Sequence, residues 1–398
     1  MFLLALIFFV LCTLLVFYTY IAFPWLLQII SRKYRMNSIA WNTEEDLPTV
    51  SIIIAAFNEE KVIEEKIRSI LNSNYPLANL EILIGSDASD DKTNEIVQQL
   101  ANSNSEIQLY EFKERRGKPS VINDLVTFSK MPLLILTDAN VLFDSDTIFN
   151  LIKHFKNGKM GLVGANILNV GQMNDGISHQ ETSYIARENR IKYHEGIRWG
   201  TMMGPFGGCF AIRRELFKPV PANFLVDDFY ICMQILKSEF ACVNELKAIC
   251  YEDVSNDILQ EYKRKARISA GNFQNLAAFS GYLLKPFSPT GFCFISHKVL
   301  RWLSPFFLLI SLFSLAYLSS FNRVYLFLFI AELLLLISPV FDAALRSFGL
   351  HWKLLRFVSY FSFMNLALLK GFFRYMAGVH SSVWTPTFRN TGKYTKAK

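Results

Sequence analysis

The stretch VSIIIAAFNEE, residues 50–60, decides the fold class of this chain. Its apolar, mostly β-branched first half predicts a buried strand, and Asn58, Glu59 and Glu60 place polar groups directly after it. In open α/β sheets, ligands bind at the carboxyl ends of the strands. The same acids would also favour the N-terminus of an ordinary helix. This stretch therefore predicts a strand and leaves its ligand open.

Similar apolar runs recur between Pro48 and about Gly281, separated by helical patterns. The expected strands are residues 50–55, 81–85, 107–111, 133–137 and 161–165, and the expected helices include residues 62–72 and 93–102. Alternation of short strands with helices predicts an α/β domain with a mostly parallel sheet. We expect this soluble domain to span residues 48–281.

Apolar segments flank this domain at both ends. Residues 1–31 carry no charge and are followed by Arg32, Lys33 and Arg35, which predicts a transmembrane anchor with the N-terminus outside and the domain in the cytoplasm. Hydrophobic residues make up 52% of the 398 residues and charged residues 19%, which favours a multi-pass membrane protein. The net charge of +7 could suggest nucleic acid. Because many basic residues flank apolar runs, we instead expect contact with membrane lipids and no nucleic-acid binding.

A second membrane region is expected over residues 285–378. It would contain an interfacial helix, spans at 302–322 and 324–341, and a segment at 357–369 whose length is more typical of a re-entrant or interfacial segment. Three spans in total would leave the basic tail, residues 379–398, in the cytoplasm. Glu332 lies inside one expected span, where an acid is either a functional site or a hydrogen-bonded contact between helices.

Two polar segments follow the second and third expected strands. In SDASDD, residues 86–91, Asp87 comes too early to cap the next helix, so it is a binding candidate, whereas either of the later acids would suit a cap. In RRGKPSVIND, residues 115–124, two arginines, a glycine and Lys118 precede a helix. This arrangement suits a phosphate-bearing ligand, although a solvated basic turn would look the same.

Three further segments carry candidate chemistry. LLILTDAN, residues 133–140, delivers Asp138 and Asn140 to one face, where both could reach a hard cation on diphosphate oxygens or simply end a strand in a turn. The pair Asp227 and Asp228 could cap a helix or supply a general base. The basic stretch EYKRKARISAGN, residues 261–272, predicts a helix with two arginines three residues apart on one face.

Taken in order, these segments resemble family 2 glycosyltransferases with the GT-A fold, and among them the membrane-bound synthases of bacterial surface polysaccharides. AAFNEE is similar to the first nucleotide-contact segment of that family, which implies donor contacts from Ala56, Asn58 and Glu59. SDASDD matches the usual SDGSTD, which implies Asp87 beside the nucleotide base. GKPSVIN resembles the GKxxAxN segment, which implies Lys118 near the donor.

The resemblance also implies the reactive groups. TDAN stands where the family has TDAD, the metal-binding DxD motif, so Asp138 and Asn140 would bind Mg²⁺ or Mn²⁺. VDD stands at the ED or TED motif and implies Asp228 as the catalytic base. RKARI occupies the (Q/R)xxRW position, which implies that Arg264 and Arg267 help to hold the leaving diphosphate, a use that suits guanidinium groups.

Two more segments complete the resemblance. GPFGGCFAIRRE, residues 204–215, is similar to the glycine-rich segment of the acceptor side, which implies acceptor-side positions for Gly207, Gly208 and Asp227. WTPTFR, residues 384–389, resembles a short element that follows the membrane region in some relatives.

Two residues depart from the family pattern. Asn140 replaces the second metal-binding aspartate, and because its amide oxygen carries no charge we expect weaker metal affinity in an active enzyme. Ile268 replaces the tryptophan associated with processive synthases, which favours transfer of a single sugar or a short product.

The sequence thus predicts a membrane-bound inverting hexosyl- or N-acetylhexosaminyl-transferase for surface-polysaccharide synthesis. It would move a sugar from a nucleotide donor, with UDP expected, to a lipid-linked or glycan acceptor near the membrane. A processive synthase, a catalytically silent nucleotide-binding membrane protein and an export channel component are the alternatives. The donor sugar and the acceptor are not fixed by the sequence.

Overall fold

The computed structural model describes residues 1–36, 39–171, 178–253, 257–350 and 352–383. The described chain divides into two compact units. The sheet unit contains residues 30–171, 181–253 and 379–383, apart from the gap at 37–38. The helical unit contains residues 1–29 and 257–378, apart from residue 351, together with residues 178–180. The C-terminal segment 379–383 therefore belongs to the sheet unit although it follows the last helix of the other unit.

The sheet unit is built on an eight-stranded sheet with the order β3-β2-β1-β4-β7-β6-β8-β5. Strands β3, β2, β1 and β4 are parallel, β7 runs antiparallel to β4 and β6, β6 and β8 are parallel, and β5 is antiparallel to β8. The strands are β1 (Val50–Ala56), β2 (Leu80–Asp87), β3 (Ile107–Phe112), β4 (Leu133–Asp138), β5 (Val141–Phe143), β6 (Met160–Val170), β7 (Cys209–Arg213) and β8 (Ala241–Asp253). The predicted α/β class, the mostly parallel sheet and all five expected strands are confirmed.

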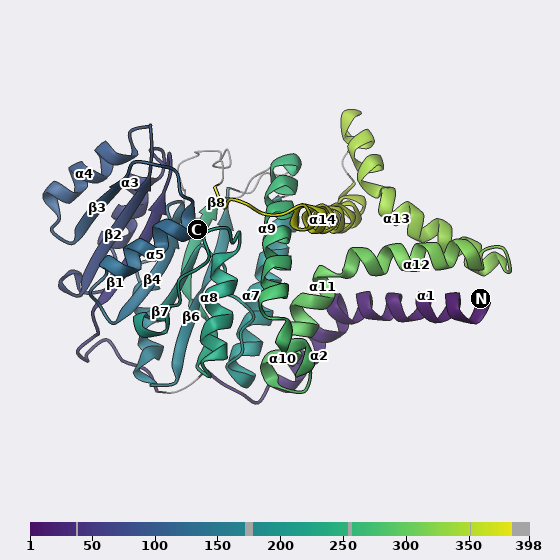
Figure 1. Cartoon of the computed structure of the whole chain (residues 1–398), viewed down its shortest axis with the longest axis horizontal. Coiled ribbons are helices and arrows are strands. Elements are labelled where there is room, and N and C mark those ends of the chain that lie inside the picture. Colours follow the sequence, from purple (N-terminus) through teal and green to yellow (C-terminus); the bar gives the residue numbers. More distant parts are fainter. Residues whose placement is uncertain (37–38, 172–177, 254–256, 351, 384–398) are drawn as a thin grey trace. The chain divides into compact units, whose positions relative to one another are not determined.

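Helices cover the sheet, as Figure 1 shows for the half that contains β1 to β4. Every residue of β1 and β2 is buried, which explains why these strands read as continuous apolar runs rather than as alternating patterns. The helices of this unit are α3 (Ile63–Leu71), α4 (Thr93–Ser103), α5 (Lys118–Phe128), α6 (Thr147–Ile152) and α8 (Asp227–Lys237), and α7 (Ser178–Trp199) lies almost wholly in it.

The helical unit contains the apolar helices. Its elements are α1 (Phe2–Phe17), most of α2 (Phe23–Ser31), α9 (Ile258–Ala278), α10 (Pro289–Cys293), α11 (Leu300–Trp302), α12 (Ser304–Leu318), α13 (Arg323–Ser347) and α14 (Lys353–Met376). Within the unit α1 packs along α12, α13 packs against both α12 and α14, and α14 packs along α9. From the sequence we expected the soluble domain to extend to residue 281. The contacts of α9 instead group this helix with the apolar helices.

Two helices among the described residues are long and apolar enough to cross a membrane, Phe2–Ser31 and Arg323–Ser347. The span expected at 302–322 is shorter than predicted, because α12 has 15 residues and is bent by 58° from Pro289–Trp302, so that the two together form a broken span or a re-entrant loop. Helix α14 extends beyond the apolar core expected at 357–369. Its place in the membrane stays a prediction.

Glu332 on α13 accepts a hydrogen bond of 2.8 Å from the Ser311 hydroxyl of α12. This contact between two helices of one unit matches the structural reading of the acid in the expected span.

Candidate active site

The carboxyl ends of three neighbouring strands meet at one edge of the sheet. In the register of the parallel strands, Ala56 of β1 pairs with Ser86 of β2, and Ala55 pairs with Asp138 of β4. Asp87 is the last residue of β2. The segments that the sequence singled out separately therefore converge where open α/β sheets bind ligands.

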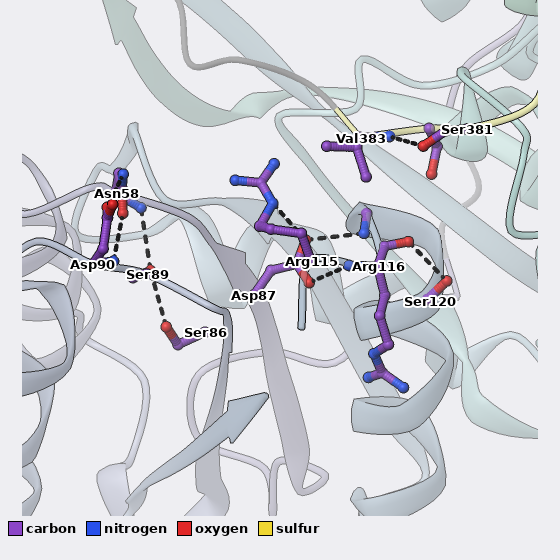
Figure 2. Close-up of polar contacts among 12 residues, drawn as sticks. Asn58, Ser86, Asp87, Ser89, Asp90, Arg115, Arg116, Ser120, Ser381 and Val383 are labelled. Carbon is purple, nitrogen blue, oxygen red and sulfur yellow. Dashed lines mark hydrogen bonds and ion pairs between the residues drawn. The ribbon is translucent and has the colours of Figure 1, made fainter. Parts of the chain in front are cut away.

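Hydrogen bonds tie the AAFNEE segment to the SDASDD segment. Asn58, whose φ of 52° is unusual for a residue with a side chain, exchanges two hydrogen bonds with Asp90: its Nδ2 donates to Oδ1 over 2.5 Å, and its Oδ1 accepts from the backbone N–H over 3.0 Å (Figure 2). The backbone N–H of Glu59 donates to Thr93 Oγ1, 2.8 Å away. Asp91 accepts the N–H of Thr93, the first residue of α4, as expected of an acid at a helix start.

Asp87 fastens the basic loop that precedes α5. Its fully buried carboxylate accepts hydrogen bonds from the backbone N–H of Arg116 (2.8 Å) and of Gly117 (2.9 Å), and the Arg115 Nε lies 3.4 Å from it (Figure 2). Asp87 thus has a structural task in addition to the predicted contact with a nucleotide base, which stays a prediction.

The guanidinium of Arg115 lies over the ring of Phe57, with its Cζ 3.1 Å from the ring centroid. The sequence interpretation missed this pair. Phe57 stands among residues that motif comparison uses, but nothing local links an aromatic residue of one loop to an arginine of another. The stacked pair and Asp87 form one cluster at the ends of β1 and β2.

Lys118 lies at the centre of a carboxylate cluster. Its Nζ is 2.7 Å from Asp138 Oδ1 and 3.6 Å from Asp227 Oδ2. Burial by itself would lower the pKa of Lys118, but the carboxylates of Asp138, Asp227 and Asp228 raise that pKa above its ordinary value. The ammonium group therefore stays charged and joins the start of α5, the end of β4 and the start of α8.

Asp228 lies in the first turn of α8 beside the glycine-rich segment. A Cβ added at Gly207 would stand 3.2 Å from Asp228 Oδ2. Burial, and then the neighbouring charge of Asp227, raise the pKa of Asp228 to about 6, against the opposing effects of Lys118 and Lys192. A carboxylate with such a pKa can accept a proton near neutral pH more readily than an ordinary one.

In the segment TDAN, Thr137 and Asp138 end β4, and Ala139 and Asn140 form the turn that joins β4 to β5. Asn140 is 2% exposed, and its Nδ2 lies 3.4 Å from Glu252 Oε1 on β8, a contact that orients the amide group. No group of three or more His, Cys, Asp or Glu side chains suited to a metal occurs in the part of the chain that the structure describes. A site of one carboxylate and one amide fits Mg²⁺ or Mn²⁺ that takes its other ligands from substrate phosphates and water.

The glycine-rich segment contacts this turn through its backbone. The carbonyl oxygen of Gly208 accepts the N–H of Asp138 over 3.1 Å and the hydroxyl of Thr137 over 2.8 Å. Gly208, predicted on the acceptor side, thus supports the predicted metal turn as well.

Arg264 and Arg267 lie on α9, in the helical unit, where Arg264 Nη1 is 3.3 Å from Glu261 Oε2. Their contact with a donor diphosphate stays a prediction. The WTPTFR segment, residues 384–389, lies outside the described residues.

Residues 51–220 match the model of a protein family described as Glycosyl transferase family 2. Across 266 residues the chain is 23% identical to a poly-beta-1,6-N-acetyl-D-glucosamine synthase of Staphylococcus epidermidis, an alignment that covers 65% of this chain and 61% of the synthase. Across 119 residues it is 31% identical to the beta-monoglucosyldiacylglycerol synthase of Trichormus variabilis, covering 29% of this chain and 25% of that enzyme. The matches thus span less than two thirds of these relatives' lengths.

Among solved structures, the chain is similar to the mannosyltransferase PcManGT of Pyrobaculum calidifontis in complex with GDP-Man and Mn²⁺. The TM-score is 0.70 at 20% sequence identity, over 93% of this chain and 99% of the other. At that identity the likeness establishes a common fold.

Proposed function

Since residues 51–220 form a family 2 glycosyltransferase domain with the GT-A fold, we propose that this chain is an inverting glycosyltransferase acting on a membrane-proximal acceptor. The observation that carries the proposal is the cluster of Lys118 with Asp138 and Asp227, next to Asp228 and its raised pKa of about 6. A charged amine and three carboxylates at the carboxyl edge of the sheet suit a donor with a diphosphate and an acceptor with a hydroxyl group.

Asp138 and Asn140 would hold a divalent cation, Mg²⁺ or Mn²⁺, whose charge offsets that of the donor diphosphate. The Mn²⁺ in the structure of the mannosyltransferase supports this assignment. Lys118 would approach the same diphosphate after exchanging its contact with Asp138 for phosphate oxygens. Arg264 and Arg267 would add charge to the leaving nucleoside diphosphate.

Asp228 would act as the general base. With a pKa of about 6 it is mostly ionised at neutral pH and can remove the proton from an acceptor hydroxyl. The oxygen then attacks the anomeric carbon from the face opposite the diphosphate, the bond to the diphosphate breaks, and the configuration inverts. Gly207 leaves room beside Asp228, because a side chain at Gly207 would approach its carboxylate, whereas a side chain at Gly208 would meet Val141.

The donor nucleotide would lie along the loops after β1 and β2, where Ala56, Asn58, Glu59 and Asp87 gather. We propose a UDP-sugar, with the GDP-mannose of the similar structure as the alternative. The names of the relatives support a glycan or a glycolipid acceptor.

Ile268 favours a single transfer or a short product over processive synthesis. A silent nucleotide-binding protein and an export channel component are the non-catalytic alternatives.

The protein associates with a membrane, since two of its described helices are long and apolar enough to cross one. We propose a multi-pass protein of the cell membrane with its catalytic domain in the cytoplasm. The basic residues Arg32, Lys33 and Arg35 directly after the first helix support this orientation.

The test uses the full chain in detergent with a panel of UDP-, GDP- and dTDP-sugars, Mg²⁺ or Mn²⁺ and a lipid extract. Free nucleotide is measured for the wild type, for Asp228→Asn, and for Asp46→Asn, a matched change at an exposed aspartate. Release from one donor that is lost only in Asp228→Asn supports the proposal and identifies the sugar. Turnover that survives in Asp228→Asn contradicts the base assignment, and silence with nucleotide binding intact favours the non-catalytic reading.

A further inference from the structure

Lys66 is a fully buried lysine on the core-facing side of α3. It shares that side with Ile63, Ile67 and Ile70, a helical spacing at which an apolar residue is expected. Burying an ammonium group is costly unless its protons find partners. Where a charged residue interrupts an apolar pattern, a functional reason is the first explanation to test.

The partners of Lys66 flank the two predicted metal ligands. Its Nζ donates to Thr137 Oγ1 over 2.9 Å and to the carbonyl oxygen of Val141 over 2.5 Å, and it lies 3.6 Å from the centroid of the Phe143 ring. Thr137 immediately precedes Asp138, and Val141 immediately follows Asn140. The ammonium group of Lys66 therefore binds both ends of residues 137–141, the turn segment that carries the two predicted metal ligands.

The hydrogen bonds continue from Lys66 to the glycine-rich segment. The Thr137 hydroxyl accepts from Lys66 and donates to the carbonyl oxygen of Gly208, which also accepts the N–H of Asp138. Helix α3, the turn and the glycine-rich segment are thus linked through one buried side chain. Burial lowers the pKa of Lys66 to about 8, against the opposing effects of Cys209, Cys250 and Asp138, so the ammonium form persists at neutral pH.

We propose that Lys66 is a positioning residue that fixes the 137–141 turn so that Asp138 and Asn140 present their oxygens to the divalent cation of the donor complex. The inference rests on the proposed function. Accurate positioning is important in this chain because Asn140 contributes no charge. Cation binding therefore depends more strongly on the geometry of the two ligands than it would with two aspartates. Residues that orient metal ligands without touching the metal typically affect metal affinity by about 10- to 100-fold.

The test compares Lys66→Met with the wild type in full-length protein in detergent. Methionine has a similar length and removes a buried charge, so the folded state should persist. Mn²⁺ binding in the presence of UDP, or of whichever nucleotide the wild type releases, is followed by the electron paramagnetic resonance of free Mn²⁺. We expect about tenfold weaker Mn²⁺ binding, an unchanged Tm, and turnover that recovers when Mn²⁺ is raised.

Ile70→Val is the matched control, because it shortens a side chain on the same buried side of α3 and removes none of the hydrogen bonds of Lys66, and it should bind Mn²⁺ as the wild type does. Should Lys66→Met fail to fold, Thr137→Val removes the hydroxyl that accepts from Lys66 and donates to Gly208, and this variant must weaken Mn²⁺ binding in the same direction. Wild-type Mn²⁺ affinity in a folded Lys66→Met, or in Thr137→Val, would overturn the inference while wild-type turnover leaves the proposed function standing. A wild type that neither binds Mn²⁺ with nucleotide nor turns over any donor would overturn both.

Discussion

Replacing Asp228 with asparagine should stop sugar transfer and at the same time stabilise the protein at neutral pH. The pKa of Asp228 is about 6 in the folded protein, against 3.8 for an unperturbed aspartate. The folded state therefore binds the proton more tightly than the unfolded chain, so the free energy of unfolding decreases as pH rises from about 4 to about 6. Above pH 6 the ionised carboxylate destabilises the fold by at most about 3 kcal/mol, an upper limit because the side chain is partly exposed.

Asparagine does not titrate, so the variant lacks this penalty. We expect its Tm at pH 7.5 to exceed that of the wild type by up to several degrees, since about 1 kcal/mol corresponds to roughly 2–4 °C for a unit of this size. The gain should disappear at pH 4. Thermal unfolding of the full chain in detergent, measured at both pH values beside nucleotide release, tests the two effects together, with Asp46→Asn as the control.

A lower Tm for Asp228→Asn at pH 7.5, or a gain that is equal at both pH values, would refute the reasoning. It would mean that the surroundings do not disfavour the ionised carboxylate. A second variant checks the cause: Asp227→Asn removes a neighbouring negative charge and should lower the pKa of Asp228. The acid limb of the kcat profile would then move to lower pH, provided that Asp228 is the base.

Three further changes test other parts of the sheet unit. Lys118→Met removes the cation among the carboxylates, so the pKa of Asp228 should rise. The acid limb of the kcat profile should then move to higher pH, and the KM for the donor should increase. An unchanged pH profile of kcat would show that Lys118 does not influence the reaction. Gly117→Ala puts a side chain at a φ of +84° and a ψ of 156°, a conformation that essentially only glycine adopts, and against the hydroxyl of Ser382. This change should cost about 1–3 kcal/mol and expose the C-terminal segment to protease, and equal cleavage would contradict the contact. Burial alone would raise the pKa of Glu245, but His154 and nearby donors lower that pKa to about 2. Glu245→Gln should therefore reduce the free energy of unfolding by up to about 3 kcal/mol at pH 7, and this loss should shrink as pH falls from about 4.5 towards 2. A difference in Tm between the variant and the wild type that stays constant with pH would argue against the ion pair.

In four of the five strands that the sequence predicted, β1, β2, β4 and the first part of β6, the predicted residues are buried on both faces, whereas β3 is only partly buried. The three that it missed lack a long, uninterrupted apolar run: β5 has three residues, β7 begins directly after the glycines of residues 207–208, and β8 interrupts its apolar residues with Glu245 and Lys247. The antiparallel direction of β7 could not be predicted from the sequence either, because the direction of strand pairing depends on partners distant in the sequence.

The motifs located the site residues but not their partners. Lys118 and Asp138 are 20 residues apart, and only the parallel sheet brings their side chains to 2.7 Å. Lys66 reads from the sequence as one more polar residue of an amphipathic helix, and its burial follows from the position of α3 over the turn. The length of α12 was overestimated, because apolar composition does not reveal where a chain bends.

The attachment of residues 379–383 to the sheet unit has a consequence for biosynthesis. Ser382 donates a hydrogen bond to the carbonyl of Ala222, and its hydroxyl lies where a side chain on Gly117 would otherwise stand. A ribosome that has just finished residue 253 has made all eight strands and every carboxylate proposed for catalysis, yet it must still translate α9 to α14 before this contact can form. At ordinary elongation rates that interval is on the order of 10 s. A product that terminates early, or is cleaved after α14, would therefore carry the proposed catalytic carboxylates with the Gly117 loop uncovered on one side.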